Sequence, residues 1–385
     1  MSALWSRLKA LLLRGPLLAW WVRRCSGLLA ADYSRFLAAR ADQSGKDEAP
    51  SPARGSGRAC GSILFLCCNM WERRELLPEL RKLADVTFLD LSACYRAGDR
   101  IKSAFQPAAF AQAVAGVPAD RRFDCAVVYL DAQRLDEEIL AWVRARTDGP
   151  VFGLNLDDKT TYGEYDVFRQ EAQNYRRWAG SFDANLTNSR AFVDIYRLDG
   201  HACLYLPTGY HYDPERHFPP SEPVFQRQLA FVGSCKPERE EFIAQLRSLG
   251  VEVEVFGGGW AGGRFMDDGP EIYRTTQINL GIGYNLPGDH FTNLKNRDFE
   301  CPGAGGCYLT TFDWELADLF QVGREILCYR TFADLCEILL HYGRRPGACL
   351  EIARAGFERA RREHTWAHRF ADVFLQAGLT VRSPS

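Results

Sequence analysis

The stretch KNRDFECPGAGGCYLTTFDWE, residues 295–315, predicts a helix, then a glycine turn, then a strand. The helix carries two cations that can neutralise phosphate oxygens and a carboxylate that can accept hydrogen bonds from both hydroxyls of a ribose. The glycines allow backbone to approach a ligand closely. A helix end with a glycine stop and a solvated charge pair is the alternative. The candidate nucleotide-binding residues are Lys295, Arg297, Glu300, Gly305 and Gly306.

The run INLGIGY, residues 278–284, predicts a buried strand immediately before this segment. The strand leads into the polar loop NLPGDHFTN, which begins at Asn285. Ligands of open α/β sheets bind outside the carboxyl ends of the strands. We therefore expect Asn285 to lie at the nucleotide site as well.

Residues 231–310 resemble the C-terminal half of the CgeB-like glycosyltransferases, a bacterial spore-maturation type group, through the pattern K-x-R-x-F-E, a small residue and two glycines. The resemblance implies an α/β chain with the GT-B fold, two Rossmann-like domains that face each other across a cleft. It also implies transfer of a sugar from a nucleoside diphosphate-sugar to a hydroxyl of a glycan, lipid or protein, with no metal or other cofactor. Lys295 and Arg297 would then act in catalysis by stabilising the departing diphosphate.

The chain departs from the wider pattern of retaining GT-B transferases at one position. In those enzymes a carboxylate in the place of Glu300 binds the ribose, and a second Glu eight positions earlier lies near the sugar, whereas this chain has Thr292 there. How the donor sugar is held, and whether the reaction inverts or retains, stays open. Two alternatives also stay open: a non-hydrolysing nucleotide-sugar epimerase, and a catalytically silent module that binds a nucleotide-sugar or glycan.

Composition supports two domains in a reducing compartment. The 385 residues, 46% of them hydrophobic, can bury two cores of ordinary size. A net charge of -2 gives no electrostatic footprint for nucleic acid. The 13 cysteines show no zinc or C-x-x-C spacing, so we expect reduced thiols in the cytoplasm and no metal site.

The first residues are apolar and basic together. Leucine and tryptophan alternate with arginine over residues 1–30, and Arg14-Gly15-Pro16 interrupts the run before it reaches the length of a membrane span. We expect a helix on the inner face of the cytoplasmic membrane, with a helix packed on the protein's own first domain as the alternative. Residues 1–58 would form this arm and a flexible linker.

Residues 59–220 predict the first Rossmann-like domain, on the acceptor side. Apolar runs over residues 62–68, 86–91, 125–130, 151–156 and 184–189 predict strands, and amphipathic helices between them indicate a parallel sheet. In the CgeB-like proteins that this chain resembles, an Asp-Asp pair follows the fourth of these strands and binds hydroxyls or removes a proton. The resemblance therefore implies a catalytic role for Asp158. Helix caps and an exposed hinge histidine are the structural alternatives. The acceptor-side candidates are Asn69, Asp157, Asp158 and His211.

Residues 221–376 predict the nucleotide-sugar donor domain, followed by a tail over 377–385. The run RQLAFVGSCKPEREEF predicts a strand, a glycine loop and a helix whose N-terminus faces phosphate, and the next strand ends in glycines before Trp260, which could stack on a base. The chain has neither a G-x-G-x-x-G fingerprint nor a Walker loop, which argues against a dinucleotide oxidoreductase. We expect one final helix over residues 350–374. The further donor-site candidates are Gly233, Ser234, Lys236 and Gly257.

Overall fold

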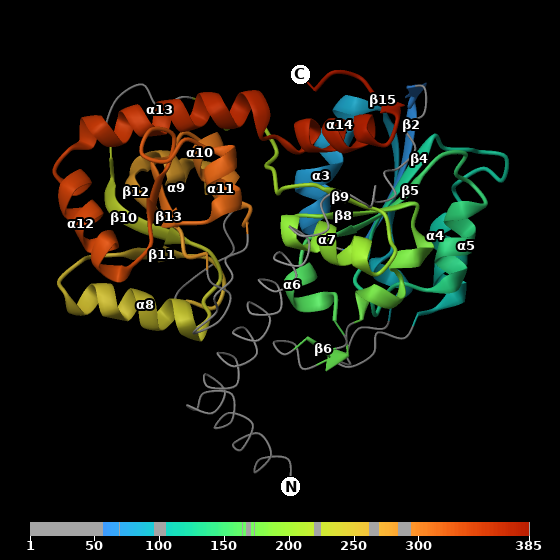
Figure 1. Ribbon diagram of the computed structural model, residues 1–385, viewed down its shortest axis with the longest axis horizontal. Helices are drawn as coiled ribbons and strands as arrows, with labels where there is room; N and C mark the ends of the chain where they lie inside the picture. Colours follow the sequence, from blue (N-terminus) through green and yellow to red (C-terminus); the bar gives the residue numbers. More distant parts are fainter. Residues whose placement is uncertain are drawn as a thin grey trace, which may run out of the picture. The chain divides into compact units, whose positions relative to one another are not determined.

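The structure is a computed structural model, which describes residues 57–68, 70–95, 105–163, 165–166, 171–172, 174–218, 225–261, 269–283 and 294–384 (Figure 1). Its contacts divide the chain into two compact units. The N-terminal unit runs through Pro214 and includes Arg359–Ser385, and the C-terminal unit is Glu215–Glu358. Asn69, Asn285, Thr292 and the arm of residues 1–56 lie outside the described residues.

The N-terminal unit is built on a six-stranded parallel sheet in the order β3-β2-β4-β5-β8-β9. β2 has the sequence SILFLC, and a continuous apolar run of this kind suits a strand that is buried on both faces. The chain leaves β2 toward β3 on one side and later returns to β4 on the other side. The strands are β2 Ser62–Cys67, β3 Asp85–Asp90, β4 Cys125–Tyr129, β5 Val151–Asn155, β8 Ala184–Thr187 and β9 Cys203–Tyr205.

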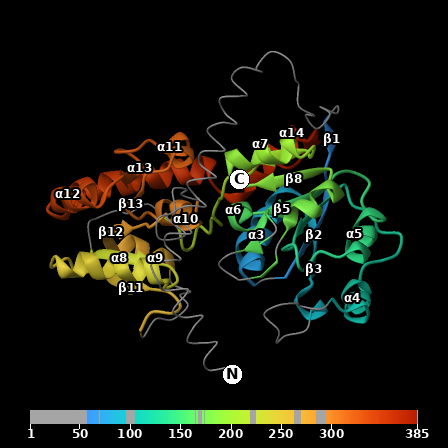
Figure 2. The same ribbon diagram turned by 60° about the horizontal axis from the view of Figure 1, so that its bottom comes forward.

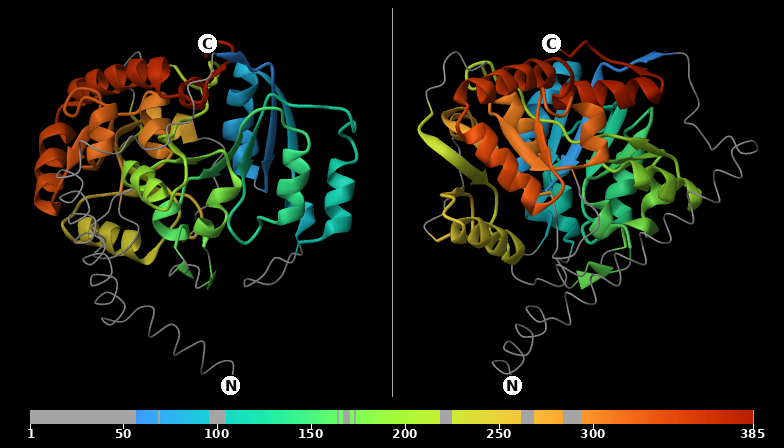
Figure 3. Two further views of the ribbon diagram at one scale, coloured as in Figure 1. Left: turned by 45° about the vertical axis from the view of Figure 1, so that its right-hand side comes forward. Right: turned by 60° about the vertical axis from the view of Figure 1, so that its left-hand side comes forward.

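Helices connect these strands, and the last helix of the chain returns to the same unit. The small parallel pair β1 (Arg58–Ala59) and β15 (Leu379–Thr380) joins the two ends of the unit, and Figure 3 shows the red C-terminal segment beside the blue N-terminal strands. β6 (Tyr165–Asp166) and β7 (Glu171–Ala172) form a short antiparallel pair. The helices are α3 Met70–Leu83, α4 Pro107–Val114, α5 Glu137–Arg144, α6 Asp158–Thr161, α7 Arg190–Leu198 and α14 Trp366–Gln376.

The C-terminal unit has a five-stranded parallel sheet in the order β11-β10-β12-β13-β14. The chain runs from the central β10 to β11 at one edge and then crosses to β12 on the other side of β10. β10 and β12 therefore enclose a topological switch point, where strand order reverses and ligands of such sheets bind. The strands are β10 Arg227–Val232, β11 Glu254–Phe256, β12 Thr276–Leu280, β13 Tyr308–Thr311 and β14 Leu327–Tyr329.

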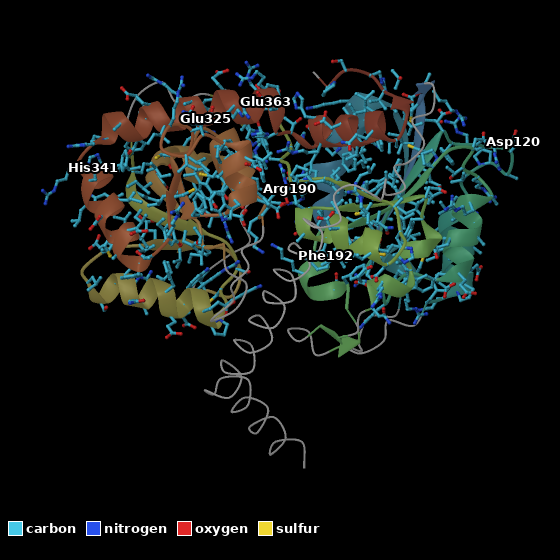
Figure 4. The ribbon with its side chains drawn as sticks, viewed as in Figure 1. Asp120, Arg190, Phe192, Glu325, His341 and Glu363 are labelled. Atoms are coloured by element: carbon cyan, nitrogen blue, oxygen red, sulfur yellow. The ribbon has the colours of Figure 1, made fainter. Side chains whose placement is uncertain are left out.

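Helices pack on both faces of this sheet. In Figures 1 and 2, β12 and β13 lie between α8 and α13, and apolar side chains of α8, α12 and α13 share one core with the strands. Exposed side chains such as Asp120 in the N-terminal unit and His341 in the C-terminal unit are labelled in Figure 4. The helices are α8 Pro237–Ser248, α9 Gly269–Thr275, α10 Arg297–Gly303, α11 Trp314–Leu319, α12 Phe332–Gly343 and α13 Pro346–Glu363.

One expectation differs from the structure. The final helix expected over residues 350–374 is two helices, because the chain breaks at His364 and the Thr365 hydroxyl caps the start of α14 by accepting from the His368 N–H. The expected domain bounds 59–220 and 221–376 stay a prediction. The contacts place the boundary of the two units between Pro214 and Glu215, and they assign residues from Arg359 onward to the N-terminal unit.

Candidate functional site

Arg297 lies at the switch point of the C-terminal unit. It is the first residue of α10, and its guanidinium is buried, with only 8% of the residue exposed. Nη1 donates to the carbonyl oxygen of Val232 at 2.8 Å, and Nη2 donates to that of Ile282 at 3.4 Å. Val232 ends β10 and Ile282 follows β12, so one side chain spans the carboxyl ends of both strands. This is the position at which the sequence predicted a nucleotide.

A second buried guanidinium, that of Arg239 on α8, lies at the same place. Its Nη1 donates to the carbonyl oxygen of Ser234 at 2.9 Å and to the Ser234 Oγ at 3.2 Å. Burial, and next the positive charge of Arg297, lower the pKa of Arg239 to about 10. Arg239 was not among the sequence-predicted residues, because an arginine in the first turns of a charged helix reads as a solvated side chain.

Among the described residues, neither guanidinium group forms an ion pair with a carboxylate, although the charge of Arg297 acts on Asp298 and Glu300. The Nε atoms of Arg239 and Arg297 are both buried and have no hydrogen-bond partner among the described residues. No ion pair joins either side chain to an acidic residue within that part of the chain. Buried charge is costly unless it is paired, and paired guanidiniums are the usual protein ligands of phosphate. The arrangement therefore suits an anion.

The glycine loop after β10 makes room for this pair. A Cβ on Gly233 would lie 2.3 Å from Nη1 of Arg297, so any larger residue there would displace that guanidinium group from its present position. The Gly233 N–H does not face a ligand as expected, because it donates to the Phe256 carbonyl oxygen at 2.8 Å. Gly257, with φ +118°, packs on the same loop, where a Cβ would lie 2.5 Å from the Gly233 carbonyl oxygen. Gly257 therefore packs closely on the backbone of Gly233, and Gly233 packs closely on the side chains of Arg297 and Phe231.

Other side chains of the loop also have structural partners. The Trp260 indole is buried, packs edge-on against Phe231, and donates from Nε1 to the Gly233 carbonyl oxygen at 2.8 Å. The structure thus gives this residue a role in supporting the loop, in place of the expected stacking on a base. Ser234 is exposed and holds Arg239, and Lys236 is the N-cap residue of α8.

Glu300 follows Arg297 by one helical turn and is half-buried. Burial raises the pKa of Glu300 to about 7, although the charge of Arg297 and a hydrogen bond from the Tyr273 hydroxyl both favour the ionised form. Near neutral pH the carboxyl group therefore exchanges between a form that only accepts hydrogen bonds and one that also donates. Either form can bind a hydroxyl.

Asp298 fixes the start of α10, and the sequence reasoning missed it. Its Oδ2 accepts from the Lys295 backbone N–H at 2.6 Å, and its Oδ1 accepts from the Tyr308 hydroxyl at 2.6 Å. Burial raises the pKa of this carboxyl group, against those hydrogen bonds. The three-residue spacing of Lys295 and Asp298 was the available signal, since residues three or four apart share a face of a helix.

Gly305 and Gly306 end α10 in a Schellman motif. The Gly306 N–H donates to the Cys301 carbonyl oxygen at 2.9 Å, and the Gly305 N–H donates to that of Pro302 at 2.9 Å. Gly305 has φ +82°, the left-handed conformation that this motif requires. A Cβ on Gly306 would lie 2.7 Å from the Cys301 Sγ. These contacts are those of the helix stop that the sequence left as an alternative.

In the N-terminal unit, Asp158 lies inside the protein at the carboxyl end of β5. It is 1% exposed, and its Oδ1 accepts from Asn155 Nδ2 at 2.6 Å and from the Tyr196 hydroxyl at 2.9 Å. Burial raises the pKa of Asp158 to about 7, against the hydrogen bonds of Thr187 and its other neighbours. Its Oδ2 has no partner of normal geometry among the described residues. Asp158 is thus enclosed by side chains of its own unit, whereas its neighbour Asp157 is exposed, and a catalytic role for Asp158 stays a prediction.

His211 belongs to a structural cluster around Glu79, a fully buried residue of α3. The Glu79 Oε1 lies 2.8 Å from His211 Nδ1 and 2.6 Å from Lys82 Nζ, and Oε2 accepts from the backbone N–H of Ala367 at 3.2 Å. Burial alone would raise the pKa of Glu79, but the hydrogen bonds from His211 and Lys82 outweigh it and hold that pKa below its ordinary value. Glu79 thus links α3 to the start of α14 and also binds His211, whose expected acceptor contact stays a prediction.

Among the described residues, no group of three or more His, Cys, Asp or Glu side chains is arranged to hold a metal ion. None of the helices in that part of the chain is long and apolar enough to cross a membrane.

Comparisons with known proteins identify the fold. The structure matches sucrose-phosphate synthase of Thermosynechococcus elongatus with a TM-score of 0.50 and 11% identity, over 82% of this chain and 98% of that chain. It matches HepE of Anabaena, solved with UDP and glucose, with a TM-score of 0.50 and 14% identity, over 81% and 98% of the two chains. No curated protein matches the sequence. The chain therefore has the two-sheet α/β architecture of the GT-B glycosyltransferases, and its residues 236–375 match the family described as glycosyl transferase-like.

Proposed function

We propose that this protein is a glycosyltransferase that moves a sugar from a nucleoside diphosphate-sugar to a hydroxyl acceptor without a metal ion. The observation that carries the proposal is the pair of buried guanidinium groups, Arg239 and Arg297, at the carboxyl ends of the strands, where neither Nε has a hydrogen-bond partner among the described residues. Glycosyl transfer leaves a diphosphate as the leaving group, and fixed positive charge stabilises the charge that develops on it.

The reaction forms a bond between the acceptor oxygen and the anomeric carbon, while the bond from that carbon to the diphosphate oxygen breaks. The electron pair of the broken bond leaves with the diphosphate, which the two arginines would bind. Glu300, one turn along α10, would bind the ribose hydroxyls. The acceptor loses its proton to a carboxylate, and Asp157 is the exposed carboxylate at the end of β5. No cofactor takes part in these steps.

A thermal-shift screen of the purified chain tests the donor assignment. Ligands that bind the native state raise its apparent stability. UDP is the first ligand to try, because HepE was solved with it, and GDP, ADP, CMP and dTDP with their sugar conjugates complete the screen. We expect one diphosphate family to raise the Tm in the presence of EDTA, and we expect Glu300→Ala to abolish that shift.

The exposed Glu241 of α8 supplies a matched control, and Glu241→Ala should keep the full shift. A Tm that no nucleoside diphosphate raises would refute the donor assignment. Product analysis with donor alone then separates transfer from epimerisation, since an epimerase needs no acceptor. Binding without turnover in the presence of candidate acceptors would favour a silent binding module.

We also propose that the arm of residues 1–30 binds the inner face of the cytoplasmic membrane. The proposal rests on its sequence, in which tryptophan and leucine alternate with arginine. Co-sedimentation with phosphatidylglycerol vesicles tests it. The full chain should sediment and a chain without residues 1–56 should not, whereas equal sedimentation of the two would disprove a membrane role for the arm.

A further inference from the structure

The C-terminal unit carries an exposed aromatic surface beside a pocket. Trp314, the first residue of α11, is 76% exposed, and its ring lies edge-on to that of Phe312 with 5.0 Å between the centroids. Phe312 in turn lines a cavity of about 360 Å³. An indole of this exposure offers an aromatic face on which an apolar face of a ligand can lie. The cavity is lined by Phe312, Val322, Cys328, Arg330, Asp334, Glu337 and Ile338.

The pocket is lined by both positively and negatively charged side chains. The Arg330 guanidinium carbon lies 4.3 Å from the centroid of the Phe312 ring, which holds the group in place while its N–H donors stay available. Glu337 is exposed and makes no ion pair with another described residue. Asp334 is held by the capping box with Thr331 at the start of α12. Two carboxylates against one guanidinium disfavour a second phosphate or an anionic membrane surface.

We propose that this surface, Trp314 with the pocket of Phe312, Arg330 and Glu337, is a saccharide subsite that binds a pyranose ring of an acceptor glycan. A pyranose has one apolar face, which can lie on an exposed aromatic ring, and hydroxyls that both donate and accept hydrogen bonds. Glu337 would accept from these hydroxyls and Arg330 would donate to them. A volume of about 360 Å³ falls within the range of small-ligand pockets, roughly 300–1,000 Å³.

The position of the subsite in the sheet favours a sugar of the acceptor over the sugar of the donor as its ligand. Phe312 follows β13 and Arg330 follows β14, so the subsite lies at the same edge of the sheet as Arg297. β14 is separated from β12 by β13, a distance of roughly 10 Å at the usual strand spacing. A donor sugar is bonded directly to its phosphate and stays beside the arginines. The subsite rests on the proposed function, and it would hold a more distant sugar of an extended acceptor.

A glycan array tests the subsite, with the full chain applied as wild type and as Trp314→Ala, Trp314→Phe and Glu337→Gln. We expect the wild type to retain particular oligosaccharides, Trp314→Ala and Glu337→Gln to lose at least tenfold in signal, and Trp314→Phe to restore part of it. The exposed Leu249 supplies the matched control, because Leu249→Ala also removes an apolar surface side chain, one that is 61% exposed. That control should bind like the wild type.

Other outcomes overturn the proposal. Failure of the wild type to retain any glycan, or equal retention by Trp314→Ala, would refute the subsite. Binding to phosphatidylglycerol vesicles that Trp314→Ala abolishes would assign the surface to a membrane instead. The Tm shift with UDP is measured on the same variants and should be unchanged. A lost subsite with an intact UDP shift therefore leaves the proposed donor function standing, and a missing UDP shift in the wild type refutes that function separately.

Discussion

Arg239 and Arg297 lie against the same aromatic ring, with their guanidinium carbons 5.6 Å and 5.0 Å from the centroid of Phe231. Burial is the main cause of the lowered pKa of Arg239. The positive charge of Arg297 lowers that pKa further, because two like charges held this closely and out of water repel each other. The aromatic face of Phe231 offsets part of the free-energy cost of burying two like charges. A bound diphosphate would offset more of that cost.

Replacing either arginine by lysine should therefore weaken UDP binding at least tenfold, or by about 1.4 kcal/mol. Lysine keeps the charge but cannot hold a backbone carbonyl and an anion at the same time. Isothermal titration of Arg239→Lys and Arg297→Lys gives the two dissociation constants. Arg247 at the far end of α8 also donates to a carbonyl oxygen, that of Val253, at 2.6 Å, so Arg247→Lys is the control. Equal affinity in all three variants would contradict the assignment.

The glycines after β11 provide a pair of neighbouring substitutions with opposite expectations. Gly257→Ala places a Cβ 2.5 Å from the Gly233 carbonyl oxygen at a φ of +118°, and it should destabilise the fold by about 2 kcal/mol or more. A Cβ on Gly258 meets no atom within 4 Å. Gly258→Ala should change the free energy of unfolding by less than about 0.5 kcal/mol. Chemical unfolding of both variants would disprove this packing argument if their stabilities were equal.

Asp158 should make the protein less stable as pH rises from 3.8 toward 7. Its pKa is raised from 3.8 to about 7 in the folded chain, so the folded state keeps a proton that the unfolded state has lost. This contribution is complete below pH 3.8 and disappears as pH approaches 7, a change of roughly 4 kcal/mol. Urea unfolding between pH 4 and pH 8 should show a flatter profile for Asp158→Asn than for the wild type. Parallel profiles would show that this carboxyl group does not titrate in that range.

Glu79 should have the opposite effect on the pH dependence of stability, because it stabilises the fold more as pH rises. Its pKa is lowered in the folded chain, so its stabilisation is present above its ordinary pKa of 4.5 and is lost as pH falls through the folded value. Glu79→Gln leaves His211 and Lys82 without their carboxylate, and it should cost roughly 3–5 kcal/mol at pH 7. The exposed Glu138 serves as the control, and Glu138→Gln should be nearly neutral. A loss of stability that is equal at pH 4 and pH 7 would rule out the ionic explanation.

The strands and the helix-turn-strand segment after Lys295 could be predicted from the sequence, because their signals are local. An apolar run such as SILFLC is buried in any parallel sheet, and β2 begins at the predicted Ser62. The helix, glycine turn and strand after Lys295 are present as α10, the Schellman motif and β13. Arg297 was singled out from its place in this segment, and it lies at the switch point of the sheet.

The functions of single side chains depended on tertiary contacts. Asp158 and Asp157 are adjacent in sequence, yet one is buried under Tyr196 and the other is exposed. His211 contacts Glu79, more than a hundred residues earlier in the chain, and no local pattern connects them. Arg239 gains its place beside Arg297 only when α8 and α10 pack on the same sheet.

The sequence by itself determined the alternation of strand and helix, and with it two parallel sheets, since hydrophobic periodicity and glycine turns act over a few residues. The tertiary structure decided which charges are brought together and which are removed from water. Burial and pairing energies depend on neighbours that are distant in the chain, as the contact of Arg239 and Arg297 with Phe231 shows.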